Sequence, residues 1–148
     1  MLNHSINNQQ AHQWTVRVYY ENTDAGGVVY HAQYLNFMER ARTEWLRILG
    51  FEHTTLLQQY NCVFVVHSMQ IQFKKSAKLD DLLTITSQIT KMGRGSLEFL
   101  QTIQLNQQKL VEASLKLACV DALTFKPMAV PLAVRCIMEK QTMELVWV

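Results

Sequence analysis

Residues 17–50 of the chain read RVYYENTDAGGVVYHAQYLNFMERARTEWLRILG. The second half of this stretch has the three- and four-residue repeat of one buried helix face, with no proline or glycine inside it. The repeating positions are Tyr34, Leu35, Met38, Ala41, Arg42, Trp45, Leu46 and Leu49. Gly50 follows, where a helix ends readily. Ahead of the repeat, Thr23–Gly27 has turn chemistry, because Asp favours turns and glycine adopts positive φ freely. We therefore expect a tight turn that leads into one long helix.

The rest of the chain has the two-residue period of β-strands. We expect a strand at Trp14–Tyr20 and a short second helix at Glu52–Tyr60. Four further strands are predicted at Val63–Lys74, Leu82–Thr90, Leu97–Leu105 and Leu110–Val120, with turns at Gly93–Gly95 and Asn106–Gln108. This order predicts an α+β fold in which a curved antiparallel sheet wraps around the long helix. Because such a sheet has open edges, we also expect a homo-oligomer.

Length and composition limit the class of protein. The 148 residues predict one domain at 14–131, a disordered lead-in at 1–13 and a C-terminal extension at 132–148 that is either a helix or a mobile tail. A net charge of +2 without a basic stripe argues against a nucleic-acid partner. No apolar run of about 18 residues predicts a membrane span, and the polar start lacks a signal-peptide pattern. Cys62, Cys119 and Cys136 form no CxxC pair, which favours reduced thiols in the cytoplasm.

One spaced signature is far more specific than these patterns. It reads Arg17-Val18-x4-Thr23-Asp24-x2-Gly27-Val28-Val29-x-His31-x2-Tyr34. It resembles the active-site signature of the 4-hydroxybenzoyl-CoA thioesterase family, and more closely that of the YbgC group, which is associated with the Tol–Pal cluster. The similarity continues through Lys78–Leu82 and from Cys119 to Pro127. The resemblance implies a hotdog fold and a homodimer or homotetramer with active sites near the subunit interface. It also implies a cytoplasmic enzyme, peripheral at the inner membrane, that hydrolyses short-chain aliphatic acyl-CoA.

Asp24 is the candidate that activates the attack on the thioester. The sequence contains no GxSxG nucleophile elbow and no cysteine in a recognisable Cys/His context. Two routes are open to the Asp24 carboxylate. It acts as a general base on water, which typically contributes about 10²–10⁴ in rate, or it attacks directly and forms a mixed anhydride.

The start of the long helix is the expected oxyanion site, because free N–H groups and the helix dipole both favour negative charge there. The resemblance assigns the oxyanion donor to the backbone amide of His31. The His31 imidazole is a further candidate for polarising the carbonyl or protonating the leaving thiolate. Gly26 and Gly27 give the thioester room to approach the backbone, and Tyr30 is an expected substrate contact. The resemblance also places Tyr20 in the site, with packing as its alternative role.

The phosphates of CoA call for cations. Lys91 and Arg94 flank the predicted glycine turn, and we prefer this pair over the alternative cluster of Lys74, Lys75 and Lys78. Solvated turn charges are the alternative interpretation of Lys91 and Arg94. His67 is expected to be a core histidine, because it lies mid-strand on an apolar face. No spacing supports a metal site, so neither a metal nor a cofactor is predicted.

Two other functions compete with acyl-CoA hydrolysis. Acyl carrier protein presents the same pantetheine arm, so an acyl-carrier-protein thioesterase is the first alternative. The second alternative belongs to another class, a non-catalytic acyl-binding or scaffold subunit of a lipid-synthesis complex.

Overall fold

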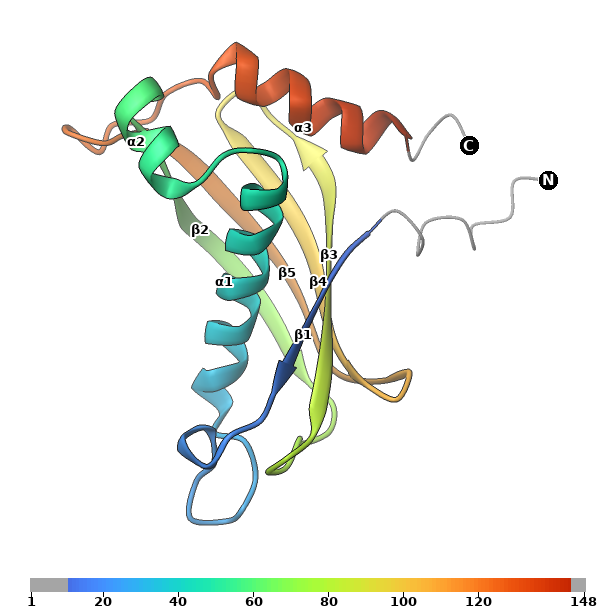
Figure 1. Cartoon of the computed structure of the whole chain (residues 1–148). Coiled ribbons are helices and arrows are strands. Elements are labelled where there is room, and N and C mark those ends of the chain that lie inside the picture. Colours follow the sequence, from blue (N-terminus) through green and yellow to red (C-terminus); the bar gives the residue numbers. More distant parts are fainter. Residues whose placement is uncertain (1–10, 145–148) are drawn as a thin grey trace.

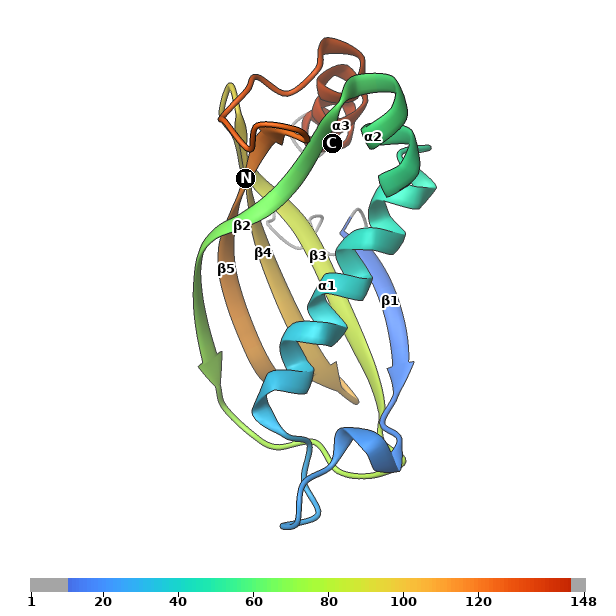
Figure 2. The ribbon, with the colours of Figure 1, turned by 90° about the vertical axis from the view of Figure 1, so that its left-hand side faces the viewer.

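A five-stranded antiparallel sheet wraps around one long helix in the computed structural model, which describes residues 11–144 (Figure 1). The elements are β1 (His12–Arg17), the 3₁₀ turn η2 (Tyr20–Asn22), α1 (His31–Ile48), α2 (His53–Tyr60), β2 (Cys62–Phe73), β3 (Leu82–Met92), β4 (Ser96–Leu105), β5 (Gln108–Asp121) and α3 (Leu132–Glu144). The strand order is β1-β3-β4-β5-β2, so β1 and β2 form the two edges. Figure 2 shows α1 in front of the sheet, between these two edge strands. The predicted α+β fold is confirmed.

Helix α1 forms where the apolar repeat predicts it. Its buried residues are Tyr34, Phe37, Met38, Ala41, Arg42, Trp45 and Leu46. They pack on the inward-facing side chains of the sheet, in one cluster around Met38 and Ile85 and another around Trp45 and Phe99. Leu35 is 37% exposed, contrary to the predicted repeat, because the buried stripe advances from Tyr34 by three residues to Phe37. The helix ends before Gly50, whose φ of 92° supplies the left-handed turn.

The hairpins of the meander lie where turn residues predicted them. The β3–β4 turn contains Gly93–Gly95, and the N–H of Gly93 donates to the carbonyl of Ser96 over 2.9 Å. The β4–β5 turn has Asn106 and Gln107 at φ of 49° and 69°, the conformation of a tight hairpin turn. Strand β2 lies antiparallel to β5, and its register shifts at a bulge between Val66 and Ser68.

The first strand differs from its prediction at both ends. β1 begins at His12, so two residues of the expected lead-in belong to the sheet, while 1–10 lie outside the described residues. It ends at Arg17 instead of Tyr20, because the Asn22 side chain accepts the N–H of Tyr19 over 2.8 Å and turns the chain into η2. The alternating pattern of a strand gives no signal for a single polar residue that bends the chain in this way.

The C-terminal extension forms helix α3, with residues 145–148 outside the described range. Figure 1 shows α3 across the end of the sheet where β3 turns into β4. Val134 and Met138 are fully buried in the Trp45 cluster. Arg135 donates to the carbonyl of Gly93 over 2.7 Å and pairs with Glu139 over 2.7 Å. The helix alternative is therefore the correct one. Within residues 11–144, none of the helices has the length and apolar character to cross a membrane.

The three cysteines are free thiols, of which Cys62 and Cys119 are buried and Cys136 is exposed. Burial, followed by the neighbouring Cys62, raises the pKa of Cys119 to about 12. Burial likewise raises the pKa of Cys62. Because thiolate is the reactive form, these two side chains are protected both sterically and chemically.

We expect an aromatic disulfide reagent at pH 8 to modify one thiol per native chain and three per chain in denaturant. A Cys136→Ser variant should show no fast-reacting thiol in its native state. Modification of two or more native thiols on the same timescale would show that the β2–β5 edge opens.

Candidate active site

The loop between η2 and α1 folds back on itself as a small hairpin. Thr23 and Val29 form an isolated bridge, and the N–H of Asp24 donates to the carbonyl of Val28 over 2.9 Å. The return bond runs from the Gly27 N–H to the Asp24 carbonyl over 3.0 Å, with Gly27 at φ 79°. The Asp24 side chain is exposed, and its Oδ1 accepts the Gly26 N–H over 2.8 Å. This Asx turn holds the carboxylate at the tip of the loop.

The hairpin delivers the chain to the first turn of α1. Tyr30 is the residue before the helix and makes no side-chain cap. Its N–H donates to the carbonyl of Asn22 over 3.0 Å, and its carbonyl accepts the N–H of Gln33 over 2.8 Å. The N–H of His31 has no acceptor among the described residues. A free N–H at the positive end of the helix dipole is suited to bind a developing oxyanion.

Two buried polar side chains fix this helix end. The N–H of Ala77 donates to the Tyr34 hydroxyl and its carbonyl accepts the N–H of Val29, each over 2.9 Å. Burial raises the pKa of Tyr34, which keeps its hydroxyl neutral. On the other side, the amide of the buried Asn22 donates to Gln33 over 2.9 Å. The sequence did not single out Asn22, and it treated Tyr34 only as helix face and signature.

Aromatic side chains surround the His31 imidazole, which is itself exposed. Its ring centroid lies 4.4 Å from that of Tyr30 and 6.3 Å from that of Phe73, at the end of β2. Phe73 also contacts Tyr34 at 5.9 Å and is 49% exposed. Tyr20 belongs to η2 on the same end of the molecule, with its side chain 82% exposed. The structure therefore gathers the predicted residues Tyr20, Asp24, Gly27, Tyr30 and His31 at one end.

Lys91 and Arg94 lie at the opposite end of the same chain. Strand β3 begins beside the site, since Leu82 pairs with Arg17 and the preceding Lys78 bridges Val28. Its 11 residues span ten steps of about 3.3 Å, so β3 ends about 33 Å along the strand from Leu82. The β3–β4 turn therefore lies at the other end of the sheet (Figure 1). One chain does not bring these two cations to Asp24. Sequence spacing alone does not reveal which end of a strand meets the helix start.

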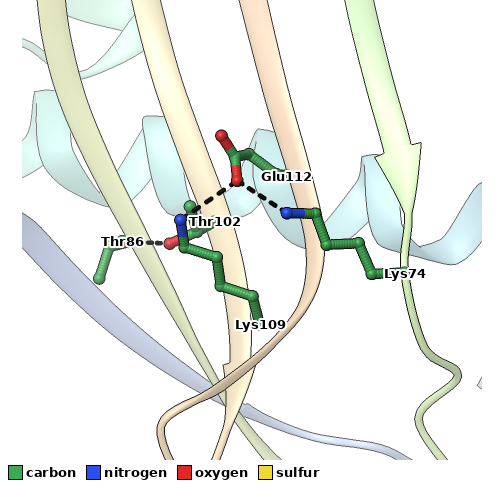
Figure 3. A network of polar contacts seen from close by, with 5 residues as sticks. All are labelled: Lys74, Thr86, Thr102, Lys109 and Glu112. Carbon is green, nitrogen blue, oxygen red and sulfur yellow. Dashed lines mark hydrogen bonds and ion pairs between the residues drawn. The ribbon is translucent and has the colours of Figure 1, made fainter.

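The alternative cations, Lys74, Lys75 and Lys78, lie on the loop between β2 and β3. This loop contacts the site through the bridge between Lys78 and Val28. Lys74 pairs with Glu112 over 3.4 Å, and Lys109 pairs with the same carboxylate over 3.2 Å (Figure 3). The hydrogen bond from Lys109 is the main cause that lowers the pKa of Glu112. Figure 3 also shows the contact between the hydroxyls of Thr86 and Thr102 on the same sheet. One carboxylate thus faces two ammonium groups.

His67 is exposed, so the prediction of a core histidine is wrong. β2 is an edge strand, and Val65, Val66, His67 and Ser68 are all exposed around the bulge. The two-residue period assumes one covered face, which this edge does not have in a single chain. Within residues 11–144 no group of three His, Cys, Asp or Glu side chains is arranged to hold a metal ion.

Comparison with known proteins places this geometry in a family. The model of the thioesterase superfamily matches residues 26–112. The acyl-CoA thioesterase YbgC of Haemophilus influenzae is 48% identical over 120 residues, which cover 81% of this chain and 88% of that protein. The long-chain acyl-CoA thioesterase FadM of Escherichia coli is 33% identical over 103 residues, covering 68% and 76%. The crystal structure of "Probable Thioesterase" from Bartonella henselae superposes with a TM-score of 0.78 at 38% identity, covering 82% and 99%.

The family match begins just after Asp24 and covers His31, all of α1, β2, β3 and β4, and the start of β5. The curved sheet around α1 is accordingly the hotdog fold that the signature implied. The chain therefore belongs to the thioesterase superfamily, within its YbgC group of acyl-CoA thioester hydrolases.

Proposed function

We propose that the amino end of α1 hydrolyses short-chain aliphatic acyl-CoA, with Asp24 activating the attack and the His31 N–H binding the oxyanion. The observation that carries this proposal is the pairing of an exposed carboxylate with an unused helix-start N–H on one short loop. Attack on the thioester carbon places negative charge on the carbonyl oxygen, and one such donor typically stabilises it by about 3–4 kcal/mol. The carbon–sulfur bond then breaks and CoA leaves as a thiolate. The exposed His31 imidazole is the proposed group that polarises the carbonyl or protonates the thiolate.

Two routes for Asp24 fit the exposed carboxylate. As a general base, Asp24 takes a proton from water while the water oxygen bonds to the thioester carbon. As a nucleophile, its oxygen forms a mixed anhydride that water then opens. A single turnover in ¹⁸O-labelled water separates the two routes, because label that enters the Asp24 carboxyl requires the anhydride.

Asp24→Asn tests the proposed chemistry with little structural change, since the asparagine oxygen still accepts the Gly26 N–H. We expect kcat to fall about 10²–10⁴-fold with the fold retained, because the amide neither attacks nor takes a proton. Asp80→Asn is the matched control, since it removes the same charge at the same end from a left-handed residue that asparagine tolerates. The measurement is the steady-state release of CoA thiol. Equal rates for Asp24→Asn and wild type would refute the role of Asp24.

Gly27→Ala tests whether the loop conformation matters to catalysis. A Cβ at Gly27 meets nothing within 4 Å, so the variant introduces left-handed strain without a clash. Such strain costs about 1–2 kcal/mol. Gly50→Ala is the matched control at the other end of α1, because Gly50 also has positive φ and open space. We expect both variants to lose similar stability in urea, but only Gly27→Ala to lose kcat. Unchanged kcat in Gly27→Ala would remove the loop from the proposal.

A homo-oligomer built through β2 completes the proposal. This 12-residue edge strand exposes Val65 and Val66 and offers unpaired backbone groups. A second copy paired antiparallel there would bring its β3–β4 turn, with Lys91 and Arg94, to the level of the first copy's Asp24. Lys74, Lys75 and Lys78 would meet the CoA phosphates from the same chain. The free thiols and this association suit a cytoplasmic enzyme.

Val65→Lys should prevent this association, because a charge on a free edge opposes strand pairing. We expect the variant to elute as a monomer with sharply reduced activity. Thr15→Lys, on the opposite edge strand β1, should leave both properties unchanged. Size-exclusion chromatography with light scattering gives the masses. A wild type that is monomeric at assay concentration and fully active would contradict the model.

A further inference from the structure

A pocket of about 240 Å³ lies between α1, α2, β2 and β5. Its walls combine apolar and polar side chains: Glu39, Arg42, Thr43, Leu46, His53, Phe64, Val66 and Leu117. Of the four that can carry charge or donate hydrogen bonds, Arg42 is the most enclosed, with 8% of its surface exposed. A buried guanidinium at an apolar pocket is costly unless its donors are satisfied.

The buried side chain of Gln101 holds the Arg42 guanidinium in place. Nη1 of Arg42 donates to Oε1 of Gln101 over 2.9 Å. Gln101 is fully buried, and its Nε2 donates to the carbonyl of Met38 over 3.0 Å and to Oγ of Ser87 over 2.8 Å. These bonds fix which end of the amide faces Arg42. The orientation of the guanidinium is therefore set by the core.

Two nitrogens of the Arg42 guanidinium group have no hydrogen-bond partner among the described residues. Among the described residues, neither Nε nor Nη2 has an acceptor, and no carboxylate lies within 4.0 Å to pair with the guanidinium. Neither nitrogen is fully enclosed, because the one buried side-chain nitrogen or oxygen without a partner in this part of the chain is His12 Nδ1. Since Arg42 lines the pocket, we infer that a ligand in the pocket reaches these N–H groups.

We propose that this pocket receives the far end of the acyl chain and that Arg42 selects acyl groups carrying an acceptor oxygen there, as a hydroxyl or a carboxylate. This inference rests on the proposed function and names its preferred substrate class. Leu46, Phe64, Val66 and Leu117 enclose the methylene groups, and a guanidinium donates hydrogen bonds only, so its ligand is an acceptor. Glu39 also lines the pocket and is exposed, and it interacts electrostatically with the Arg42 guanidinium, so a carboxylate ligand meets one charge of each sign there. His53, from α2, lines the same pocket.

In the homodimer proposed above, the pocket of one copy would serve the reacting residues of the other. Antiparallel pairing of two β2 strands about His67 sets Phe73 of one copy opposite Asn61 of the second, and Ile71 opposite Val63. Phe73 contacts His31, with 6.3 Å between the ring centroids. The start of the second copy's β2, including Phe64 of its pocket, then lies beside that His31. Within one chain, by contrast, Arg42 is 11 residues and about 16 Å along α1 from His31.

Matched thioesters of six and eight carbons test the preference: hexanoyl-, 6-hydroxyhexanoyl- and adipoyl-CoA, and their eight-carbon counterparts. At one or both lengths, we expect wild-type kcat/KM to favour an oxygenated member over its methyl-terminated match by tenfold or more, the usual size of a charge-assisted hydrogen bond. The hydroxyl and carboxylate arms tell which acceptor the site takes. In Arg42→Met the ratio of kcat/KM for the oxygenated thioester to kcat/KM for its methyl-terminated match should fall toward one. Arg42→Lys should retain part of this preference for the carboxylate. Arg40→Met, an exposed arginine on the same helix, is the control that keeps the ratio.

Two measurements keep the proposal testable if Arg42→Met folds poorly. Adipate or suberate should inhibit the wild type more strongly than hexanoate or octanoate. Heterodimers of an Asp24→Asn chain with an Arg42→Met chain should retain about half of the wild-type rate on the preferred oxygenated substrate, because one composite site is intact. At both chain lengths, equal wild-type kcat/KM for the oxygenated and the methyl-terminated thioesters would overturn the proposal. A preference that is unchanged in Arg42→Met would also overturn it. Failure to hydrolyse any acyl-CoA would instead refute the proposed function itself.

Discussion

The position of the loop that carries Asp24 depends on the two backbone groups of one residue, Ala77. Its carbonyl accepts the N–H of Val29 and its N–H donates to the hydroxyl of Tyr34, so the loop after β2 is tied to both sides of the helix start. These bonds join residues more than 40 positions apart and are shielded from water by the core around Tyr34. Removing one partner would leave a buried polar group unsatisfied, which typically costs about 1–3 kcal/mol. The free N–H of His31 is thus held by a tertiary contact instead of by helix propensity.

Local patterns predicted most of the fold, because α1 and the meander have clean periods and glycine-containing turns. The site prediction was uneven for a related reason. The signature named Asp24 and His31, whose neighbours lie within one loop, but Asn22 and Ala77 act through contacts that leave no period in the sequence. The preferred cations Lys91 and Arg94 lie at the far end of β3, since strand spacing fixes distance but not direction relative to a helix. His67 was wrongly predicted to lie in the core, because an edge strand has the same sequence pattern as a half-buried strand.

The interior of this protein is not purely apolar, and its polar part is organised around α1. Gln101 makes three side-chain hydrogen bonds while fully buried, linking the middle of the helix to β3 and β4. Because these bonds are directional and Gln101 itself is fully satisfied, they specify one position of the helix along the sheet. A helix held against sliding keeps its amino end at the level of the Ala77 bonds. The hydrogen bonds of Gln101 in the core therefore also help to fix the position of the helix start at the candidate site.

The bulge between Val66 and Ser68 has a consequence for molecular recognition. A regular edge strand of 12 residues accepts almost any other strand, which makes it a starting point for aggregation. A bulge bends the strand, increases its twist and leaves one residue unpaired, so most foreign strands lose register on reaching it. A strand with the same irregularity, related by a two-fold axis, would match it. In the proposed homodimer the bulge would therefore favour pairing with a second copy of this chain over pairing with other strands.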